Sequence, residues 1–202
     1  MADLPTTTLA DVLDRRQVMD AGLKSLWSPA PRIAGPAFTV RCPPGDNLML
    51  HAAIYRAEPG SIIVVESGDP DYALAGGNVC AVAQRNGIAG FVLDGLIRDI
   101  GEVREMGFPV FGRGVIPIPG GKAAALALNV PIRCAGVAVT PGDLVVADED
   151  GVVVVPAAQV GDTLAAAGAK LASDAATSLD DWERAHRAKI DGLLAAWQAE
   201  QS

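Results

Sequence analysis

The chain has 202 residues, of which half are apolar and only 4% are aromatic, and its 24 acidic and 16 basic residues give a net charge of −8. This length accommodates one domain with a sizeable core of aliphatic side chains. The acidic balance argues against nucleic-acid binding, which needs a basic surface to displace counterions, so we expect no nucleic-acid partner.

Several further features predict a cytoplasmic protein without a membrane partner. We find no N-terminal segment in which basic residues precede an apolar run, as they do in a signal peptide. We also find no uncharged apolar run that is long enough to span a bilayer. Cys42, Cys80 and Cys134 lie far apart and are odd in number, which favours buried free thiols over disulfides.

The first third of the chain alternates predicted helices and strands. Residues 4–26 have apolar side chains near the helical period and are predicted to be helical. Three prolines and a glycine make 27–36 a loop, which a short strand at 37–41 follows. A turn at 42–47 leads into a helix that contains His51, and Pro59-Gly60-Ser61 introduces a buried strand at 62–66. At its apolar-periodic position, a packed His51 is expected rather than a catalytic one.

The stretch from residue 76 to residue 107 is the most informative. Gly76-Gly77-Asn78 is typical of a loop, and a short helix follows that Asn86-Gly87 should end. Residues 88–93 are continuously apolar, which predicts a strand buried on both faces. Asp94-Gly95 then turns the chain, and Arg98-Asp99 opens a second short helix that ends at Gly107.

These residue types indicate a ligand site. A glycine-rich loop that opens onto a helix offers free N–H groups to an anion. Arg98 adds a guanidinium for a carboxylate, and Asp99 adds a carboxylate for a cation. If the two ends of the stretch converge, they form a site for a metal-bound small molecule that bears a carboxylate. Two alternatives stay open: Gly76-Gly77 is an ordinary turn, and Asp99 with Glu102 forms a capping box.

The remaining part of the chain is read as strands followed by helices. Further strands are expected at 110–111, 115–118 and 132–139, and a hairpin at 144–155 has Asp148-Glu149-Asp150-Gly151 as its solvated tip. Gly112-Arg113-Gly114 and Gly120-Gly121-Lys122 are interpreted as turns.

From residue 157 onward the pattern is helical. Ser178 and Asp181 have the spacing of a capping box. Trp182 and Trp197 lie on the apolar side of the last helix, so they need a surface to cover, on the same subunit or on a neighbour. A terminal helix of this kind often docks on a neighbouring subunit.

The sequence resembles the RraA-like family, which includes regulator of ribonuclease activity A and the class II 4-hydroxy-4-methyl-2-oxoglutarate aldolases. The matches lie between about residues 30 and 156, and they comprise Pro59-Gly60-Ser61, Gly76-Gly77-Asn78, residues 87–99, Pro109-Val110-Phe111 and residues 141–156. The Gly-Gly-Asn loop set before Asp-Gly-x-x-Arg-Asp is the specific part of this resemblance.

The resemblance implies an α/β fold class, as a compact swivelling β/β/α-type domain over residues 1–156. Residues 157–202 would form a helical extension that packs on the same or a neighbouring subunit. A homotrimer or homohexamer, with active sites between subunits, is also implied.

The resemblance further implies a metal-dependent lyase. It would cleave 4-hydroxy-2-oxo acids to pyruvate and decarboxylate oxaloacetate through a metal-stabilised enolate, with a small 2-oxo acid as substrate. The pyruvate moiety would be bound by the loop and the arginine, that is by Gly76, Gly77, Asn78, Val79 and Arg98. Asp99 would ligate Mg²⁺ or Mn²⁺, and Arg98 and Asp99 are the expected catalytic residues. Glu183 is the candidate for a further acidic metal ligand, supplied by a neighbouring subunit.

Two comparisons with the family pattern bear on this expectation. Some aldolases carry an acidic residue near Gly77 or Asn78 and this chain has none, so the sequence does not identify the proton donor. Members that act only as ribonuclease regulators can lack the residue equivalent to Asp99. Its presence favours the enzyme over the alternative, a non-catalytic protein that binds and inhibits ribonuclease E. The sequence leaves open the exact aldol substrate, the metal and the choice between trimer and hexamer.

Overall fold

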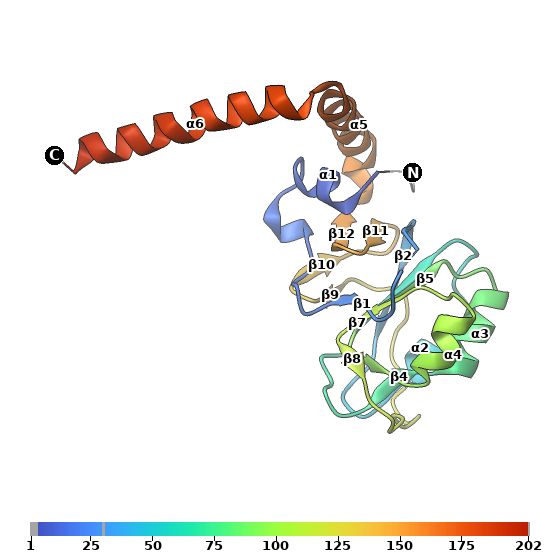
Figure 1. The fold of residues 1–202 in the computed structure, drawn as a ribbon. Helices are drawn as coiled ribbons and strands as arrows, with labels where there is room; N and C mark the ends of the chain where they lie inside the picture. Colours follow the sequence, from blue (N-terminus) through green and yellow to red (C-terminus); the bar gives the residue numbers. More distant parts are fainter. Residues whose placement is uncertain (1–3, 30, 202) are drawn as a thin grey trace.

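The computed structural model describes residues 4–29 and 31–201. The body is a mixed α/β fold built on a seven-stranded sheet with the order β1-β7-β5-β3-β2-β11-β12 (Figure 1). The bounds of these strands are β1 (Lys24–Ser25), β2 (Ile33–Arg41), β3 (Ile62–Glu66), β5 (Gly90–Asp94), β7 (Val110–Gly112), β11 (Leu144–Asp148) and β12 (Gly151–Val155).

The centre of this sheet is buried on both faces, as the continuous apolar runs predicted. Because successive side chains of a strand point to opposite faces, Ile63 and Val65 of β3 pack on one side and Ile62 and Val64 on the other. The first side is covered by the helices α2 (Leu48–Ala53), α3 (Gly77–Arg85) and α4 (Ile100–Glu105). The second is covered by the hairpin of β9 (Ile132–Cys134) and β10 (Val137–Val139) together with β11 and β12.

A second, small parallel sheet brings two loops together. It consists of β4 (Ala73–Ala75), β6 (Leu96–Ile97) and β8 (Gly114–Val115) in that order. Ala75 and Ile97 are paired in this sheet, so β4 and β6 end side by side at their carboxyl ends. The Arg98 N–H extends the ladder by donating to the Ala75 carbonyl at 2.9 Å. Gly76 and the Arg98-Asp99 pair therefore become neighbours.

The prediction of a helix over residues 4–26 is largely wrong. This segment contains only α1 (Thr6–Ala10), the 3-10 turn η1 (Arg15–Gln17) and β1. Met19 instead donates its N–H to the Val152 carbonyl at 3.0 Å, and Leu26 donates to Val110 at 3.0 Å. Because the sheet supplies backbone partners, the apolar residues pack on strands without forming a helix. The contact between this segment and β12 also brings the two ends of the sheet close together, which nearly closes it into a barrel.

Two loop and strand boundaries also differ from expectation. β2 begins at Ile33, inside the segment expected to be a loop, and Pro36 lies where the strand changes neighbours. Up to Pro36 it pairs with β11, and from Ala37 with β3, so the missing N–H of proline interrupts no continuous ladder. The strand expected at 132–139 is a hairpin, because Ala135 and Gly136 turn the chain with φ values of 46° and 84°.

The hairpin of β11 and β12 is confirmed, but its tip is partly buried. Asp148 is 6% exposed, and it accepts hydrogen bonds from the Thr6 N–H at 2.9 Å and the Thr6 hydroxyl at 2.5 Å. Asp148 thus fastens α1 to the sheet, whereas Glu149 and Asp150 are exposed at the tip, as predicted. Cys42, Cys80 and Cys134 are buried and free, as predicted.

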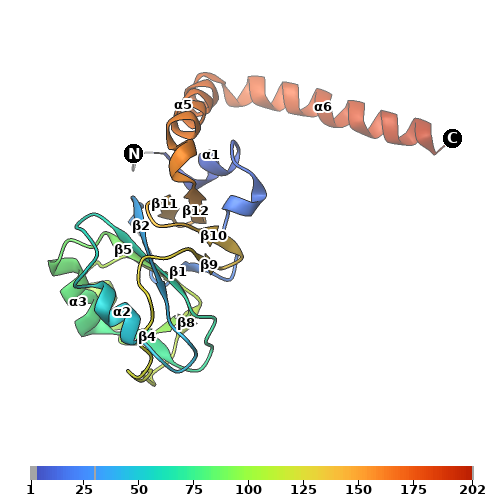
Figure 2. The same ribbon diagram turned by 180° about the vertical axis from the view of Figure 1, so that it is seen from behind.

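The C-terminal helices leave the body of the protein. The short turn η2 (Ala157–Gln159) leads into α5 (Val160–Ala176), which packs on α1 through residues that include the buried Ala167. In α6 (Leu179–Glu200), Ser178 caps the first turn by accepting a hydrogen bond from the Asp181 N–H at 3.1 Å, as predicted. Figures 1 and 2 show α6 projecting away from the sheet. No helix in the described part of the chain is long and apolar enough to cross a membrane.

Candidate active site

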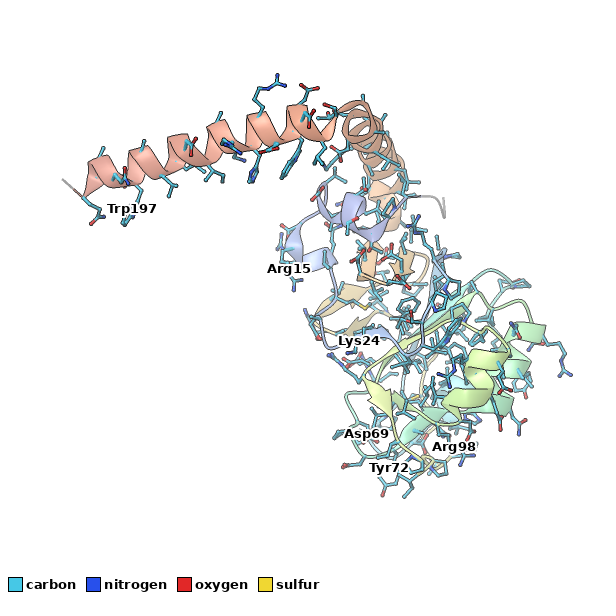
Figure 3. All side chains as sticks on the ribbon, viewed as in Figure 1. Arg15, Lys24, Asp69, Tyr72, Arg98 and Trp197 are labelled. Atoms are coloured by element: carbon cyan, nitrogen blue, oxygen red, sulfur yellow. The ribbon has the colours of Figure 1, made fainter. Side chains whose placement is uncertain are left out.

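One pocket lies at the shared edge of β4 and β6. Gly76, Asn78, Val79, Arg98 and Asp99 all line it, so the structure brings together the loop and the pair that the sequence singled out. Within this loop and pair, Gly77 alone lies outside the lining. Figure 3 places Arg98 at the end of the body remote from α6. The carboxyl end of parallel strands is a common place for a ligand site, and here it carries the charged groups.

Asp99 does not cap the helix that follows it, so the capping-box alternative is wrong. Its side chain makes no capping hydrogen bond to α4 and instead accepts one from the Gly77 N–H at 3.1 Å. Its backbone is left-handed, with φ 57°, a conformation that aspartate tolerates better than most residues. The Asp99 carboxylate is thereby directed to the glycine loop, 3.5 Å from the Arg98 Nε atom.

Close approach of side chains from the next loop and helix favours glycine at both positions, so the two glycines do more than form a turn. A Cβ on Gly76 would lie 2.4 Å from the Asp99 Oδ2 atom and 3.0 Å from the Arg98 Cγ atom. A Cβ on Gly77 would lie 2.0 Å from a carboxylate oxygen of Glu102. Glu102 therefore occupies the space where a side chain on the loop would stand. The loop itself has no acidic residue, but α4 places one over it.

The loop also forms the N-terminus of α3. The amides of Asn78 and Val79 are in the first helical turn, where no intrahelical acceptor exists, so they are available to an anion that enters the pocket. The Arg98 guanidinium lies beside them with 42% of its side chain exposed. Behind them, Cys80 is fully buried, and burial together with the Asp99 charge raises the pKa of its thiol to about 12. Cys80 is therefore a packing residue without thiolate chemistry.

The donor set fits a hard divalent cation held by few protein ligands. Among the described residues there is no group of three or more His, Cys, Asp or Glu side chains that could hold a metal ion. The Asp99 carboxylate is 38% exposed and lines the pocket. Magnesium keeps several waters and commonly takes one or two carboxylates plus substrate oxygens, so a single aspartate is compatible with it. A site for zinc would need more ligands.

Three further pocket residues escaped the sequence analysis. Asn47, His51 and Lys122 line the same pocket as Arg98 and Asp99, although Asn47 precedes α2, His51 lies in α2 and Lys122 lies in the loop after β8. His51 was expected to be a packing residue, and Lys122 was assigned to a turn. Burial lowers the pKa of His51, and the nearby Lys122 charge lowers it further, so its imidazole is mainly neutral at pH 7.

Glu183 is remote from the pocket within one chain. It lies on α6, where its carboxylate pairs with Arg187 at 2.6 Å. A single chain therefore does not bring Glu183 to Asp99, and its role as a ligand from a neighbouring subunit stays a prediction.

Comparisons with known proteins agree with the sequence resemblance. Residues 6–154 match the RraA-like family, described as Aldolase/RraA. The chain is 40% identical over 194 residues to a Halalkalibacterium halodurans protein provisionally named 4-hydroxy-4-methyl-2-oxoglutarate aldolase, covering 95% of this chain and 92% of that protein. It is 32% identical over 152 residues to the 4-hydroxy-4-methyl-2-oxoglutarate aldolase of Thermus thermophilus, covering 75% and 92%. The structure of the RNA-processing inhibitor RraA from Thermus thermophilus matches with a TM-score of 0.69 and 31% identity, covering 76% and 93%.

Proposed function

Because the chain belongs to the RraA-like family, we propose that it is a class II aldolase, a lyase that cleaves 4-hydroxy-2-oxo acids of the 4-hydroxy-4-methyl-2-oxoglutarate type to pyruvate. We further propose that it depends on a divalent cation, Mg²⁺ or Mn²⁺, and also decarboxylates oxaloacetate. The observation that carries this proposal is the convergence of the Gly76 loop with Arg98 and Asp99 in one pocket.

The residues of the glycine loop and the Arg98-Asp99 pair have distinct tasks in the proposed reaction. Breaking the bond between C3 and C4 leaves its electron pair on the pyruvate half as an enolate, with negative charge on the 2-oxo oxygen, while the 4-hydroxyl group gives its proton to a base and becomes the carbonyl of the second product. A bound divalent cation supplies a Lewis acid for that oxygen. Asp99 would hold the cation, and the Gly77 N–H keeps the Asp99 carboxylate in place. The amides of Asn78 and Val79 would receive the substrate carboxylate at the helix N-terminus.

Arg98 would fix the orientation of the 2-oxo acid. Its guanidinium can make two parallel hydrogen bonds to a carboxylate or bridge a carboxylate and a carbonyl oxygen, which lysine cannot. A charge-assisted hydrogen bond contributes about 1.5–3 kcal/mol, which is roughly a tenfold to hundredfold effect on affinity or rate. Positioning by Arg98 therefore adds to cation chemistry without replacing it.

Replacing Arg98 with lysine should mainly weaken substrate binding. We expect the KM for the aldol substrate to rise by about tenfold with a smaller change in kcat, because the charge is kept and the fork is lost. Steady-state kinetics of pyruvate release measure both constants. Arg85→Lys, at the far end of α3, is the matched control. An unchanged KM in Arg98→Lys would remove the clamp from the mechanism.

The function itself is tested by pyruvate release from 4-hydroxy-4-methyl-2-oxoglutarate and from oxaloacetate, each with Mg²⁺ and with chelator. We expect release that requires the cation. A pull-down against ribonuclease E, again with and without chelator, tests the alternative suggested by the likeness to RraA. Capture of the ribonuclease without any pyruvate release would favour the regulator over the lyase.

We also propose that the chain forms a homo-oligomer, a trimer or hexamer. α6 has apolar side chains that the described part of the chain leaves 38% to 76% exposed: Leu179, Trp182, Ile190, Leu193, Leu194 and Trp197. Such a surface favours burial against another subunit. Light scattering after size exclusion should give a mass several times that of one chain, and serine at both Trp182 and Trp197 should lower it. A monomeric wild-type chain would contradict this prediction.

A further inference from the structure

The second wall of the pocket carries polar groups that the pyruvate half of the substrate does not use. We define the Lys122 wall as Asn47, His51 and Lys122, which line the pocket together with Arg98 and Asp99. We infer that the Lys122 wall recognises the other half of the substrate, with Lys122 binding its distal carboxylate. This inference rests on the proposed function and names the residue that would select dicarboxylic 2-oxo acids.

The loop that carries Lys122 is held firmly against α2. One oxygen of Asp46 accepts hydrogen bonds from the N–H groups of Ala123 and Ala124. On the other side of Lys122, the Asn47 N–H donates to the Gly121 carbonyl at 2.9 Å. The side-chain amide of Asn47 adds bonds at 3.3 Å to the carbonyls of Gly120 and Ala73. Hydrogen bonds on both sides thus hold the backbone at Lys122 in place, while the residue itself is exposed.

Lys122 and the Asn47 Oδ1 atom make no direct contact with a partner in the described residues. Against the effect of burial, however, backbone hydrogen bonds and the Lys122 charge lower the pKa of the nearby Asp46 carboxyl, and His51 has a backbone hydrogen bond at Leu74. Within residues 4–29 and 31–201, Lys122 makes no ion pair. Asn47 is 2% exposed, and its Oδ1 atom is buried without a hydrogen-bond partner in the same part of the chain, because both bonds of that side chain use Nδ2. An unpaired buried acceptor is costly, and a ligand that donates a hydrogen bond would remove that cost.

The three groups match the C4 end of a 4-hydroxy-2-oxo dicarboxylate. An ammonium is a point charge suited to a carboxylate. A mainly neutral imidazole and an amide oxygen are acceptors suited to a hydroxyl group. The opposite end of such a substrate finds Arg98 and the α3 amides, so each half meets groups of complementary charge. A monocarboxylic 2-oxo acid would offer Lys122 no distal carboxylate to bind.

The experiment compares two unreactive ligands that differ only in the distal group. Titration calorimetry with Mg²⁺ present measures the affinity of the full-length chain for 2-oxoglutarate and for 2-oxopentanoate, which has a methyl group in place of the distal carboxylate. We expect wild type to prefer 2-oxoglutarate by about tenfold or more, as one charge-assisted hydrogen bond provides. Lys122→Met should abolish this preference and leave the affinity for 2-oxopentanoate unchanged. The control is Lys24→Met, on the exposed edge strand β1, which should keep the preference for 2-oxoglutarate (Figure 3).

The outcomes separate this inference from the proposed function. Equal weakening of both ligands in Lys122→Met, or equal affinity of wild type for both, would overturn the role of Lys122. Binding of neither ligand to wild type would overturn the inference together with the proposed function. If the preference is present and depends on Lys122 but no pyruvate is released, the inference holds and only the proposed lyase activity fails.

Discussion

Replacing Asp99 with asparagine should abolish cation-dependent pyruvate release and leave the fold intact. We expect kcat/KM to fall by about a thousandfold or more, because removing the carboxylate removes the group that would hold the Lewis acid, which provides several kcal/mol of charge stabilisation. The described part of the chain offers no three-residue metal cluster elsewhere that could take over this task.

Asparagine is the sharpest replacement at this position for two structural reasons. Its side-chain oxygen can still accept the hydrogen bond from the Gly77 N–H, and it tolerates the left-handed backbone that Asp99 adopts. The variant therefore changes charge without forcing a rearrangement. Thermal unfolding checks the fold, and Mn²⁺ titration calorimetry measures cation affinity independently of turnover.

Asp71→Asn is the matched control, since it makes the same chemical change at an exposed position. We expect it to retain activity and Mn²⁺ binding. Wild-type turnover by Asp99→Asn with cation present would exclude Asp99 as the residue that holds the cation. Loss of turnover with unchanged Mn²⁺ affinity would place the cation elsewhere and leave Asp99 a different role.

The part of the site that could be predicted from the sequence lies within one continuous stretch, from Gly76 to Asp99. The glycine loop and the Arg98-Asp99 pair follow β4 and β6, and the pairing of Ala75 with Ile97 joins them. Local rules are sufficient here, because glycine next to a helix start and a charged pair after an apolar run are both visible in the sequence. The same rules placed β3 and the hairpin of β11 and β12, whose apolar runs leave little choice of structure.

The Lys122 wall could not be predicted, because long-range hydrogen bonds assemble it. Asp46 and Asn47 bind a loop more than seventy residues further along the chain, and no local pattern marks either side. Glu102 raised a related difficulty. Its spacing from Asp99 is that of a capping box, yet the Asp99 carboxylate accepts a hydrogen bond from the glycine loop and the Glu102 carboxylate lies over that loop. At residues 4–26 a near-helical spacing arose from packing on strands, which periodicity alone does not distinguish from a helix.

Replacing Gly76 with alanine should lower kcat/KM by about a hundredfold or more through one added methyl group. Gly76 has φ −150° and ψ −171°, extended backbone that alanine adopts without strain, so the effect would be steric. The new Cβ would lie 2.4 Å from the Asp99 Oδ2 atom and 3.0 Å from the Arg98 Cγ atom, which forces both side chains to move. Misplacement of catalytic groups by about 1 Å can lower a rate a hundredfold.

Gly101→Ala provides the matched control in the helix that follows Asp99. A Cβ at Gly101 meets no atom within 4 Å, and alanine is favoured over glycine inside a helix by about 1 kcal/mol. We therefore expect Gly101→Ala to keep full activity with equal or higher thermal stability, whereas Gly76→Ala keeps its fold and loses activity. Parallel assays of pyruvate release and unfolding temperature measure both. If Gly76→Ala were as active as Gly101→Ala, close contact between the loop and the Arg98-Asp99 pair would be unnecessary for catalysis, and the site would have to be sought outside this pocket.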